Sequence, residues 1–278
     1  MSNVILGESK NHPRGMMYAL FAVSLWATLG VIFKLTVSTL DSFVVAIYVG
    51  FFTTLILGIN LVMQTKIQET LRVLKRQLSF FIVTGIIGLG IQQVFYLKGY
   101  QLLPASQVVV IFYLYPLMML LLSGFLFKEK ISKNSALINC LEFVGLYILI
   151  AQGKSLDIGM NLGTIATFSA ALSWAAFSVL IKHQKFDTDI GMFLFNLFGL
   201  LFLLCMIPMF RFSFELTIIQ CLGILYLAIF PGAIAFIVWN RALHLTTTGI
   251  CANIALLTPI ISVLLSVIFL HEPILGVG

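Results

Sequence analysis

The sequence predicts an all-α polytopic membrane protein built from two inverted-topology repeats of five transmembrane helices, with only four helices in the second repeat of this chain. Three observations predict this class: the composition, a series of long apolar runs and an internal repeat. Hydrophobic residues make up 60% of the chain and charged residues 9%, and the mean hydropathy is +1.10. A soluble domain of this size does not need so much apolar surface.

The apolar runs are long enough to cross a bilayer as helices. A helix needs about 20 apolar residues to span the hydrocarbon core, whereas a membrane β-barrel would show alternating segments of about 10 residues. The first run is longer than the apolar core of a signal peptide, which is about 7–15 residues, so we expect it to be retained. The expected spans are 15–34, 42–63, 79–97, 105–127, 134–151, 161–181, 190–210, 217–239 and 247–270.

The net charge of +6 is a topology signal, because the basic residues gather on one side of the expected spans. One side holds Lys10, Arg14, Lys66, Arg72, Lys75, Arg76, Lys128, Lys130, Lys133, Lys182, Lys185 and Arg241. The other side holds only Lys34, Lys98, Lys154 and Arg211. The positive-inside rule then places residues 1–14 in the cytoplasm of a multi-pass protein of the cell (inner) membrane, and nucleic-acid binding is not expected.

The chain contains an internal repeat with two offsets. Gly15, Trp26 and Lys34 recur 148 residues later as Gly163, Trp174 and Lys182. Further on, Pro116, Leu121, Leu122, Ser123 and Glu129 recur 143 residues later as Pro259, Leu264, Leu265, Ser266 and Glu272. The same offset pairs Tyr96 with Trp239 and Lys98 with Arg241. The first repeat therefore covers 15–151 and the second 161–278, with 152–160 as an outer loop.

The number of spans between the two repeats makes their topology inverted. Five spans separate the two starts, and an odd number reverses the direction of the second copy. Inverted repeats are the usual architecture of secondary transporters, with the substrate site near the midplane where the repeats meet. A tenth helix would begin near residue 277, so it is absent from this chain. Either the chain is a fragment, or the protein has nine helices.

The segment between the second and third spans has an amphipathic pattern. Apolar residues at helical spacing lie opposite a basic set, as in helices at a membrane surface. The apolar residues are Ile67, Leu71, Leu74 and Leu78, and the basic ones are Lys66, Arg72, Lys75 and Arg76. We favour a connector that lies on an anionic leaflet over a sensor or docking helix.

Several motifs together resemble one transporter family. They are the tryptophan in the first helix of each half, the segment YLKGYQL (96–102) with its counterpart WNRALHL (239–245), and the proline-to-glutamate stretches. This combination resembles the drug/metabolite transporter superfamily, and more narrowly its ten-helix EamA-type exporters. The resemblance implies two inverted five-helix repeats, cytoplasmic termini, and export of amino acids, related metabolites or drugs in exchange for protons. The absent tenth helix departs from that pattern.

Polar and aromatic residues of the inner spans are candidates for a substrate cavity, because lipid cannot satisfy their hydrogen bonds. Trp26 and Trp174 lie at matching mid-helix positions and would wall an amphipathic or cationic substrate, with simple packing as the alternative. The predicted cavity residues are Trp26, Gln92, Tyr96, Tyr113, Trp174, Trp239 and Asn253. Gln93, Tyr115 and Asn240 belong to the same polar group, of which some members would only join helices.

Two prolines at matching positions are candidate hinges. Pro116 and Pro259 each remove one backbone hydrogen bond from a membrane helix, which is tolerated when neighbours or water satisfy the freed carbonyl. The kink would act either as a gating hinge or as a static packing feature.

Three carboxylates are candidates for proton coupling. Glu142 falls in the middle of an apolar run, where an ionisable group costs about 2.5–3.5 kcal/mol and is a functional candidate by default. Its alternative role is hydrogen bonding between helices. Glu129 and Glu272 lie at helix ends, where a structural cap or anchor is the favoured interpretation.

The remaining side chains predict no enzyme. His12, His183, His244 and His271 lie at the terminus or at helix ends on both sides of the membrane, and the cysteines form no C-x-x-C pair. We expect no catalytic residues, no metal and no cofactor. The function predicted is a proton-coupled secondary active exporter of a small molecule that works by alternating access. A lipid-linked metabolite flippase or a passive channel is the alternative, and the oligomeric state, including a homodimer, stays open.

Overall fold

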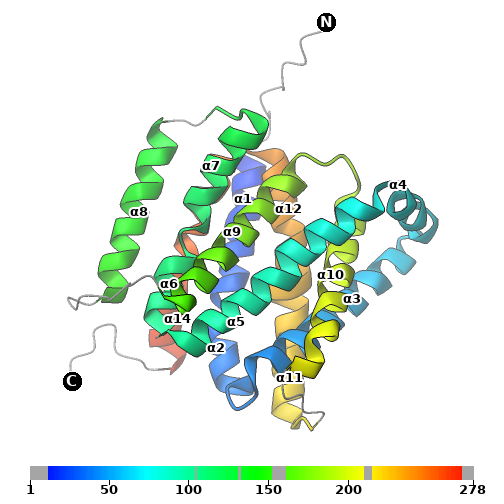
Figure 1. Ribbon diagram of the computed structural model, residues 1–278, viewed down its shortest axis with the longest axis horizontal. Coiled ribbons are helices and arrows are strands. Elements are labelled where there is room, and N and C mark those ends of the chain that lie inside the picture. Colours follow the sequence, from blue (N-terminus) through cyan, green and yellow to red (C-terminus); the bar gives the residue numbers. More distant parts are fainter. Residues whose placement is uncertain (1–11, 104, 131–132, 152–160, 210–214, 271–278) are drawn as a thin grey trace, which may run out of the picture.

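The computed structural model describes residues 12–103, 105–130, 133–151, 161–209 and 215–270. The described residues fold into helices, which pack side by side as one bundle (Figure 1). Their bounds are α1 (His12–Ala27), α2 (Leu29–Ile32), η1 (Phe33–Val37), α3 (Ser42–Met63), α4 (Ile67–Gly85), η2 (Ile86–Ile91), α5 (Gln92–Leu102), α6 (Ala105–Phe112), α7 (Tyr115–Phe127), α8 (Lys133–Ala151), α9 (Leu162–Lys182), α10 (Thr188–Met206), η3 (Ile207–Met209), α11 (Ile218–Leu227), η4 (Ala228–Ile234), α12 (Ala235–Leu245), α13 (Thr248–Ala255) and α14 (Leu257–Leu270).

Among the described residues, eight helical segments are long and apolar enough to cross a membrane, which confirms the all-helical polytopic class. They are Pro13–Val37, Ser42–Met63, Ile67–Gly99, Gln107–Phe127, Leu162–Lys182, Thr188–Met209, Ile218–Leu245 and Thr248–Leu270. The fifth expected span corresponds to α8, whose described apolar segment is the shorter Ala136–Gly145. Helix α8 stands at the edge of the bundle, beside α7 (Figure 1).

The amphipathic connector is a helix, and it continues into the third span. Helix α4 begins at Ile67 and leads through η2 to α5, with one non-helical residue, Gln77, at φ −134° and ψ 31°. The sequence had placed the start of the third span at residue 79, two residues beyond this kink. A kink at this point lets the basic amphipathic turns follow a membrane surface while the apolar turns enter the bilayer.

Two irregular positions of the helices recur at the repeat offset of 143. A π-helical segment occurs at η2 and again at η4, which lie between helices of the same order in each half. The break between α6 and α7 at Tyr113 and Leu114 has its counterpart in the break between α13 and α14 at Leu256. This correspondence is consistent with two copies of one five-helix unit.

The two halves exchange packing partners. Helix α1 of the first half packs on α12 of the second, and α9 of the second half packs on α5 of the first. These are equivalent pairs, since α1 corresponds to α9 and α5 to α12. Close approach of the end of α4 to α10 depends on a small residue: a Cβ at Gly85 would lie 2.7 Å from the carbonyl oxygen of Phe195 on α10.

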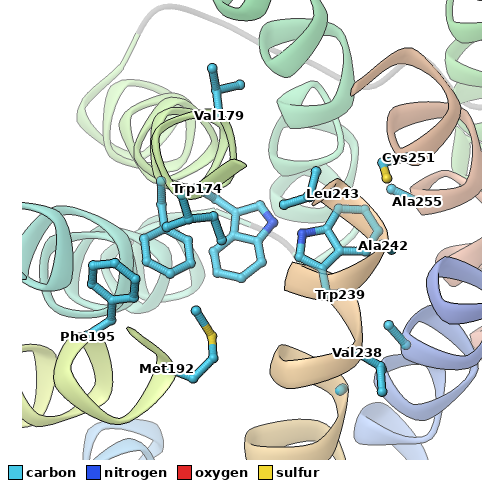
Figure 2. Close-up of a cluster of buried hydrophobic side chains, with 14 of the residues drawn as sticks. Trp174, Val179, Met192, Phe195, Val238, Trp239, Ala242, Leu243, Cys251 and Ala255 are labelled. Atoms are coloured by element: carbon cyan, nitrogen blue, oxygen red, sulfur yellow. The ribbon is translucent and has the colours of Figure 1, made fainter. Parts of the chain in front are cut away.

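The apolar core lies where α9, α10, α12 and α13 meet (Figure 2). Trp174, Met192, Phe195, Trp239 and Cys251 contribute to it and are buried. Many large apolar side chains on the outside of the bundle are exposed, for example Phe125 at 83% and Met63 at 79%. Exposed apolar side chains at that density suit lipid as the surrounding solvent.

Candidate functional site

Three tryptophans from three helices meet in the middle of the bundle. Trp26 on α1 contacts Trp174 on α9, with ring centroids 5.9 Å apart and an interplanar angle of 79°. It also contacts Trp239 on α12, with centroids 5.3 Å apart. Figure 2 shows the indole nitrogens of Trp174 and Trp239 on facing edges of the two rings. The structure thus brings together Trp26 of the first half and two predicted cavity residues of the second.

Trp26 is held by a hydrogen bond to an irregular turn. Its indole Nε1 donates to the carbonyl oxygen of Pro231 at 3.0 Å. This carbonyl lies in the π-helical segment η4, where the N–H of Ala235 donates to Phe230 and not to Pro231. The wide turn therefore frees an acceptor, and the indole N–H, which needs a partner when buried, takes it.

An aromatic chain links this cluster to two further predicted cavity residues. The ring of Tyr115 lies 6.5 Å from that of Trp174 and 5.4 Å from that of Phe112. Phe112 in turn lies 4.4 Å from Tyr96, and Tyr115 lies 5.8 Å from Tyr113. Phe112 was not predicted, because a phenylalanine in an apolar run carries no signal that separates a cavity position from a lipid-facing one.

The other two predicted cavity residues are amides and are not members of this aromatic chain. Gln92 begins α5 directly after η2, and it is buried. The amide oxygen of Asn253 on α13 accepts a hydrogen bond from Asn139 on α8. Asn253 therefore joins α8 to the bundle, as the sequence allowed for some members of the polar group.

Buried polar atoms without a partner gather on α9 and α12. Among the described residues these include Ser178 Oγ, Trp239 Nε1 and both amide atoms of Asn240. All three residues are at most 1% exposed. A buried donor or acceptor that stays unpaired costs about 1–3 kcal/mol, and such atoms in a native protein call for an explanation such as a ligand or a second conformation.

The predicted hinge prolines stand at helix starts. Pro116 is in the first turn of α7 and Pro259 in the first turn of α14, each just after a break in the span. Pro259 cannot donate to the carbonyl of Ala255, and the hydroxyl of Thr258 donates to that oxygen instead, at 2.8 Å. Each proline therefore separates two short helices rather than bending one.

The helix ends on one side of the bundle carry the basic residues, and we call this side the basic end. Glu129 joins several of these helix ends. Its carboxylate accepts from Lys182 Nζ at 2.8 Å, from the backbone N–H of Thr248 at 3.0 Å and from the Thr248 hydroxyl at 2.7 Å. Ser123 Oγ also donates to it. One carboxylate of the first half thus ties down the last residue of α9 and the first residue of α13. The sequence indicated a cap or anchor here, without its partners.

A second network joins the halves at the basic end. Lys66 Nζ lies 2.8 Å from Asp187 and 3.6 Å from Asp189. Gln64 Nε2 donates to Asp189 at 3.0 Å, and Arg241 lies 3.4 Å from the other oxygen of that carboxylate. Asp187 also caps α10 by accepting from the backbone N–H of Asp189. The turn after α3 is thereby bonded to the start of α10.

The pKa values at the basic end follow from these bonds. Burial alone would raise the pKa of Glu129, but hydrogen bonds from Lys182, Ser123 and Thr248 lower it from 4.5 to about 2. The hydrogen bond with Asp187 raises the pKa of Lys66. Burial alone would raise the pKa of Asp187, but the hydrogen bond from Lys66 lowers it, and the net shift is downward. These carboxylates are therefore ionised at neutral pH.

Glu142 lies in α8, but its side chain is outside the described residues, and so is all of Glu272. Within the described part of the chain, no group of three or more His, Cys, Asp or Glu side chains is placed to hold a metal ion.

Comparison with known proteins identifies the family. The model of the EamA-like transporter family matches residues 13–151 and 161–276. The chain belongs to the EamA-like transporter family. The predicted resemblance is confirmed, and the apolar helical segments of the described residues show a multi-pass membrane protein of this family.

Curated relatives of this EamA-like chain include three bacterial and archaeal proteins. It is 27% identical to Protein PecM of Dickeya dadantii over 70% of this chain and 66% of PecM. It is 28% identical to an uncharacterized transporter in the sor 3'region of Acidianus ambivalens, over 54% of this chain and 58% of that protein. It is 24% identical to the uncharacterized transporter YetK of Bacillus subtilis, over 72% of this chain and 63% of YetK. The matches thus span less than two thirds of the length of each of these relatives, from 58% to 66%.

A solved crystal structure shares the fold of the EamA-like chain. The two structures superpose with a TM-score of 0.78 over 93% of this chain and 90% of the other, at 22% identity.

Proposed function

We propose that this EamA-like transporter is a secondary active exporter of a small metabolite, amino acid or drug across the cytoplasmic membrane, working by alternating access and coupled to protons. One observation carries the proposal: the aromatic contact of Trp26 with Trp174 stands at the seam of the two halves, between helices of corresponding order. A binding site on that seam is exposed to one side or the other as the halves move.

The chemistry of the centre favours an amphipathic or cationic substrate. Aromatic faces attract apolar groups and cations. The unpartnered buried atoms of Trp239 and Asn240 supply donors and an acceptor for the polar part of such a substrate. We assign the cavity to Trp26, Gln92, Tyr96, Tyr113, Trp174, Trp239 and Asn253, with Asn253 placed to couple the site to α8.

Bonds across the two halves at the basic end support alternating access. Glu129 of the first half holds Lys182 and Thr248 of the second, and Lys66 holds Asp187. Opening of the basic end requires these bonds to break. The helix breaks before Pro116 and Pro259 are the points at which α7 and α14 would turn as that happens.

The proton-coupling residue that we propose is Glu142. Its place in α8 is three positions after Asn139, which bonds to α13. A carboxylate within a membrane helix takes up a proton readily, because burial disfavours its charged form. Orientation with the N-terminus in the cytoplasm follows from the distribution of basic residues.

Flux into proteoliposomes tests the proposal. The purified protein is reconstituted and offered a panel of radiolabelled amino acids, quaternary ammonium compounds and small aromatic metabolites, with and without an imposed pH gradient. We expect saturable uptake of at least one compound that increases with the gradient, and loss of this increase in Glu142→Gln. Flux that is linear in concentration would instead support a channel. Transport restricted to lipid-linked compounds would support a flippase. Saturable flux that does not depend on the pH gradient would show that transport is not coupled to protons.

A further inference from the structure

A second candidate site lies at the basic end, and none of the three tryptophans lines it. A pocket of about 340 Å³ has an apolar wall and a polar end. Ile56 and Leu57 of α3 contribute to the wall, together with Ile234 and Ile237 beside or on α12. Asp189 and Arg241 form the polar end. The pocket thus lies on the seam between a helix of the first half and a helix of the second.

The depth of the pocket matches one leaflet of a bilayer. Ile56 and Gln64 both line it and are eight residues apart along α3 and the turn that follows, which is about 12 Å at 1.5 Å per residue. One leaflet contributes about 15 Å of hydrocarbon. Leu55 and Ile59 of the same helix are 46% and 50% exposed, as expected for side chains that face lipid. The pocket therefore lies beside the acyl chains of that leaflet.

The exposed rim of the polar end is basic. The side chain of Arg241 is 45% exposed, and its contact with Asp189 is long, at 3.4 Å. Asp189 is only 8% exposed; it lies 3.6 Å from Lys66 and accepts a hydrogen bond from Gln64. Arg241 also lines a neighbouring pocket of about 380 Å³, together with Lys185 and His244. A guanidinium has five donors, so Arg241 retains capacity for an anion.

We propose that this pocket binds an anionic phospholipid of the leaflet at the basic end, with an acyl chain against Ile56 and Ile237 and the phosphate on Arg241 and Lys185. Charge complementarity and depth favour a lipid over a soluble anion, because a soluble anion would use the polar end alone. A lipid bound here touches both halves, so conformations that separate α3 from α12 lose the site. The inference does not rest on the proposed transport activity.

Binding of defined lipids to the purified full chain tests the proposal without any flux measurement. Native mass spectrometry compares retention of phosphatidylglycerol and phosphatidylcholine by the wild type, Arg241→Gln and Lys98→Gln. Lys98 is the repeat counterpart of Arg241 and is an exposed residue at the opposite end, so it serves as a matched control. We expect the wild type and Lys98→Gln to prefer phosphatidylglycerol. Arg241→Gln should bind it about fivefold more weakly, the change expected for one basic residue at an anionic surface.

A second variant tests the apolar part of the pocket. Ile237→Trp fills the pocket and leaves Arg241 in place, so it should also lose phosphatidylglycerol. Glycerol phosphate, which carries no acyl chain, should compete poorly with the lipid. Equal retention by the wild type and both pocket variants would overturn the proposal. Competition by glycerol phosphate as strong as by the lipid would overturn it too, because the site would then recognise a soluble anion.

Discussion

Glu129 and Lys182 come from opposite halves of the chain and meet at 2.8 Å at the basic end of the bundle. The same carboxylate accepts from the first backbone N–H of α13, so one side chain holds three segments together. The pair is partly buried, with side chains 22% and 14% exposed. A partly buried charge with several hydrogen bonds contributes more to stability than an exposed ion pair does, and an exposed pair contributes about 0–1 kcal/mol.

Removal of the charge at Glu129 should loosen the basic end. Glu129→Gln keeps the size of the side chain and weakens its bonds to Lys182 and Thr248, at a cost of about 1.5–3 kcal/mol for hydrogen bonds to a charged group. We expect a lower melting temperature and faster labelling of a cysteine introduced next to Thr248. Lys130→Gln is the control, because Lys130 is the exposed residue directly after Glu129 and is not one of the partners described for this network. Identical labelling of both variants would show that Glu129 does not hold the basic end closed.

The low pKa of Glu129 predicts a loss of stability in acid. Its pKa is depressed from 4.5 to about 2 in the folded protein, so its contribution is present above pH 4.5 and is lost as pH falls toward 2. Melting temperatures at pH 7, 4.5 and 3 should therefore fall more steeply for the wild type than for Glu129→Gln. Parallel pH profiles of the two proteins would contradict the assignment.

The tryptophan cluster makes intrinsic fluorescence a reporter of the candidate site. The chain has three tryptophans, and all of them are in this cluster. A transported substrate should therefore change the emission in a saturable way. An unchanged spectrum in the presence of a transported compound would place the substrate elsewhere.

Replacement of Trp26 separates its hydrogen bond from its ring. Trp26→Phe leaves the Pro231 carbonyl unpaired, at a cost of about 1–3 kcal/mol, while Trp26→Ala adds a cavity at a cost of about 3–5 kcal/mol. We expect Trp26→Phe to lower the melting temperature and Trp26→Ala to lower it further. Trp26→Ala should also weaken substrate binding more than Trp26→Phe does. Phe21→Leu, a 50% exposed position on the same helix, is the control and should change neither property. Equal melting temperatures for Trp26→Phe and the wild type would show that the hydrogen bond to Pro231 does not contribute to stability.

The proline breaks should matter for turnover more than for stability. Pro259→Ala restores an N–H that can compete with Thr258 for the Ala255 carbonyl, so α13 and α14 can join into one stiffer helix. We expect a similar melting temperature and a lower maximal flux. Pro116→Ala should act in the same direction, and Pro208→Ala, in η3, should not. Normal flux in both repeat variants would mean that the breaks are static.

Much of the fold could be predicted from local sequence, because a helix that faces lipid must be apolar along its whole length. The repeat offsets also marked Trp26 and Trp174 as a pair, and their rings do meet. The partners of Glu129 could not be predicted, since Lys182 and Thr248 are 53 and 119 residues away and each is of a common residue type at a helix end. The π-helical turns were equally hidden. Pro231 lies in one of these turns, and only the fold shows that its carbonyl binds Trp26.

The exchange of partners between the halves determines when each helix can be buried during synthesis. Helix α1 is made before its main partner, α12, which begins only at Ala235. While the intervening residues are translated, α1 must wait in the bilayer with its small, tightly packing face (Ala19, Ala22, Val23) against lipid. Assembly of the central tryptophans is therefore a late, post-insertion event, and neither half completes its own interior before the other arrives.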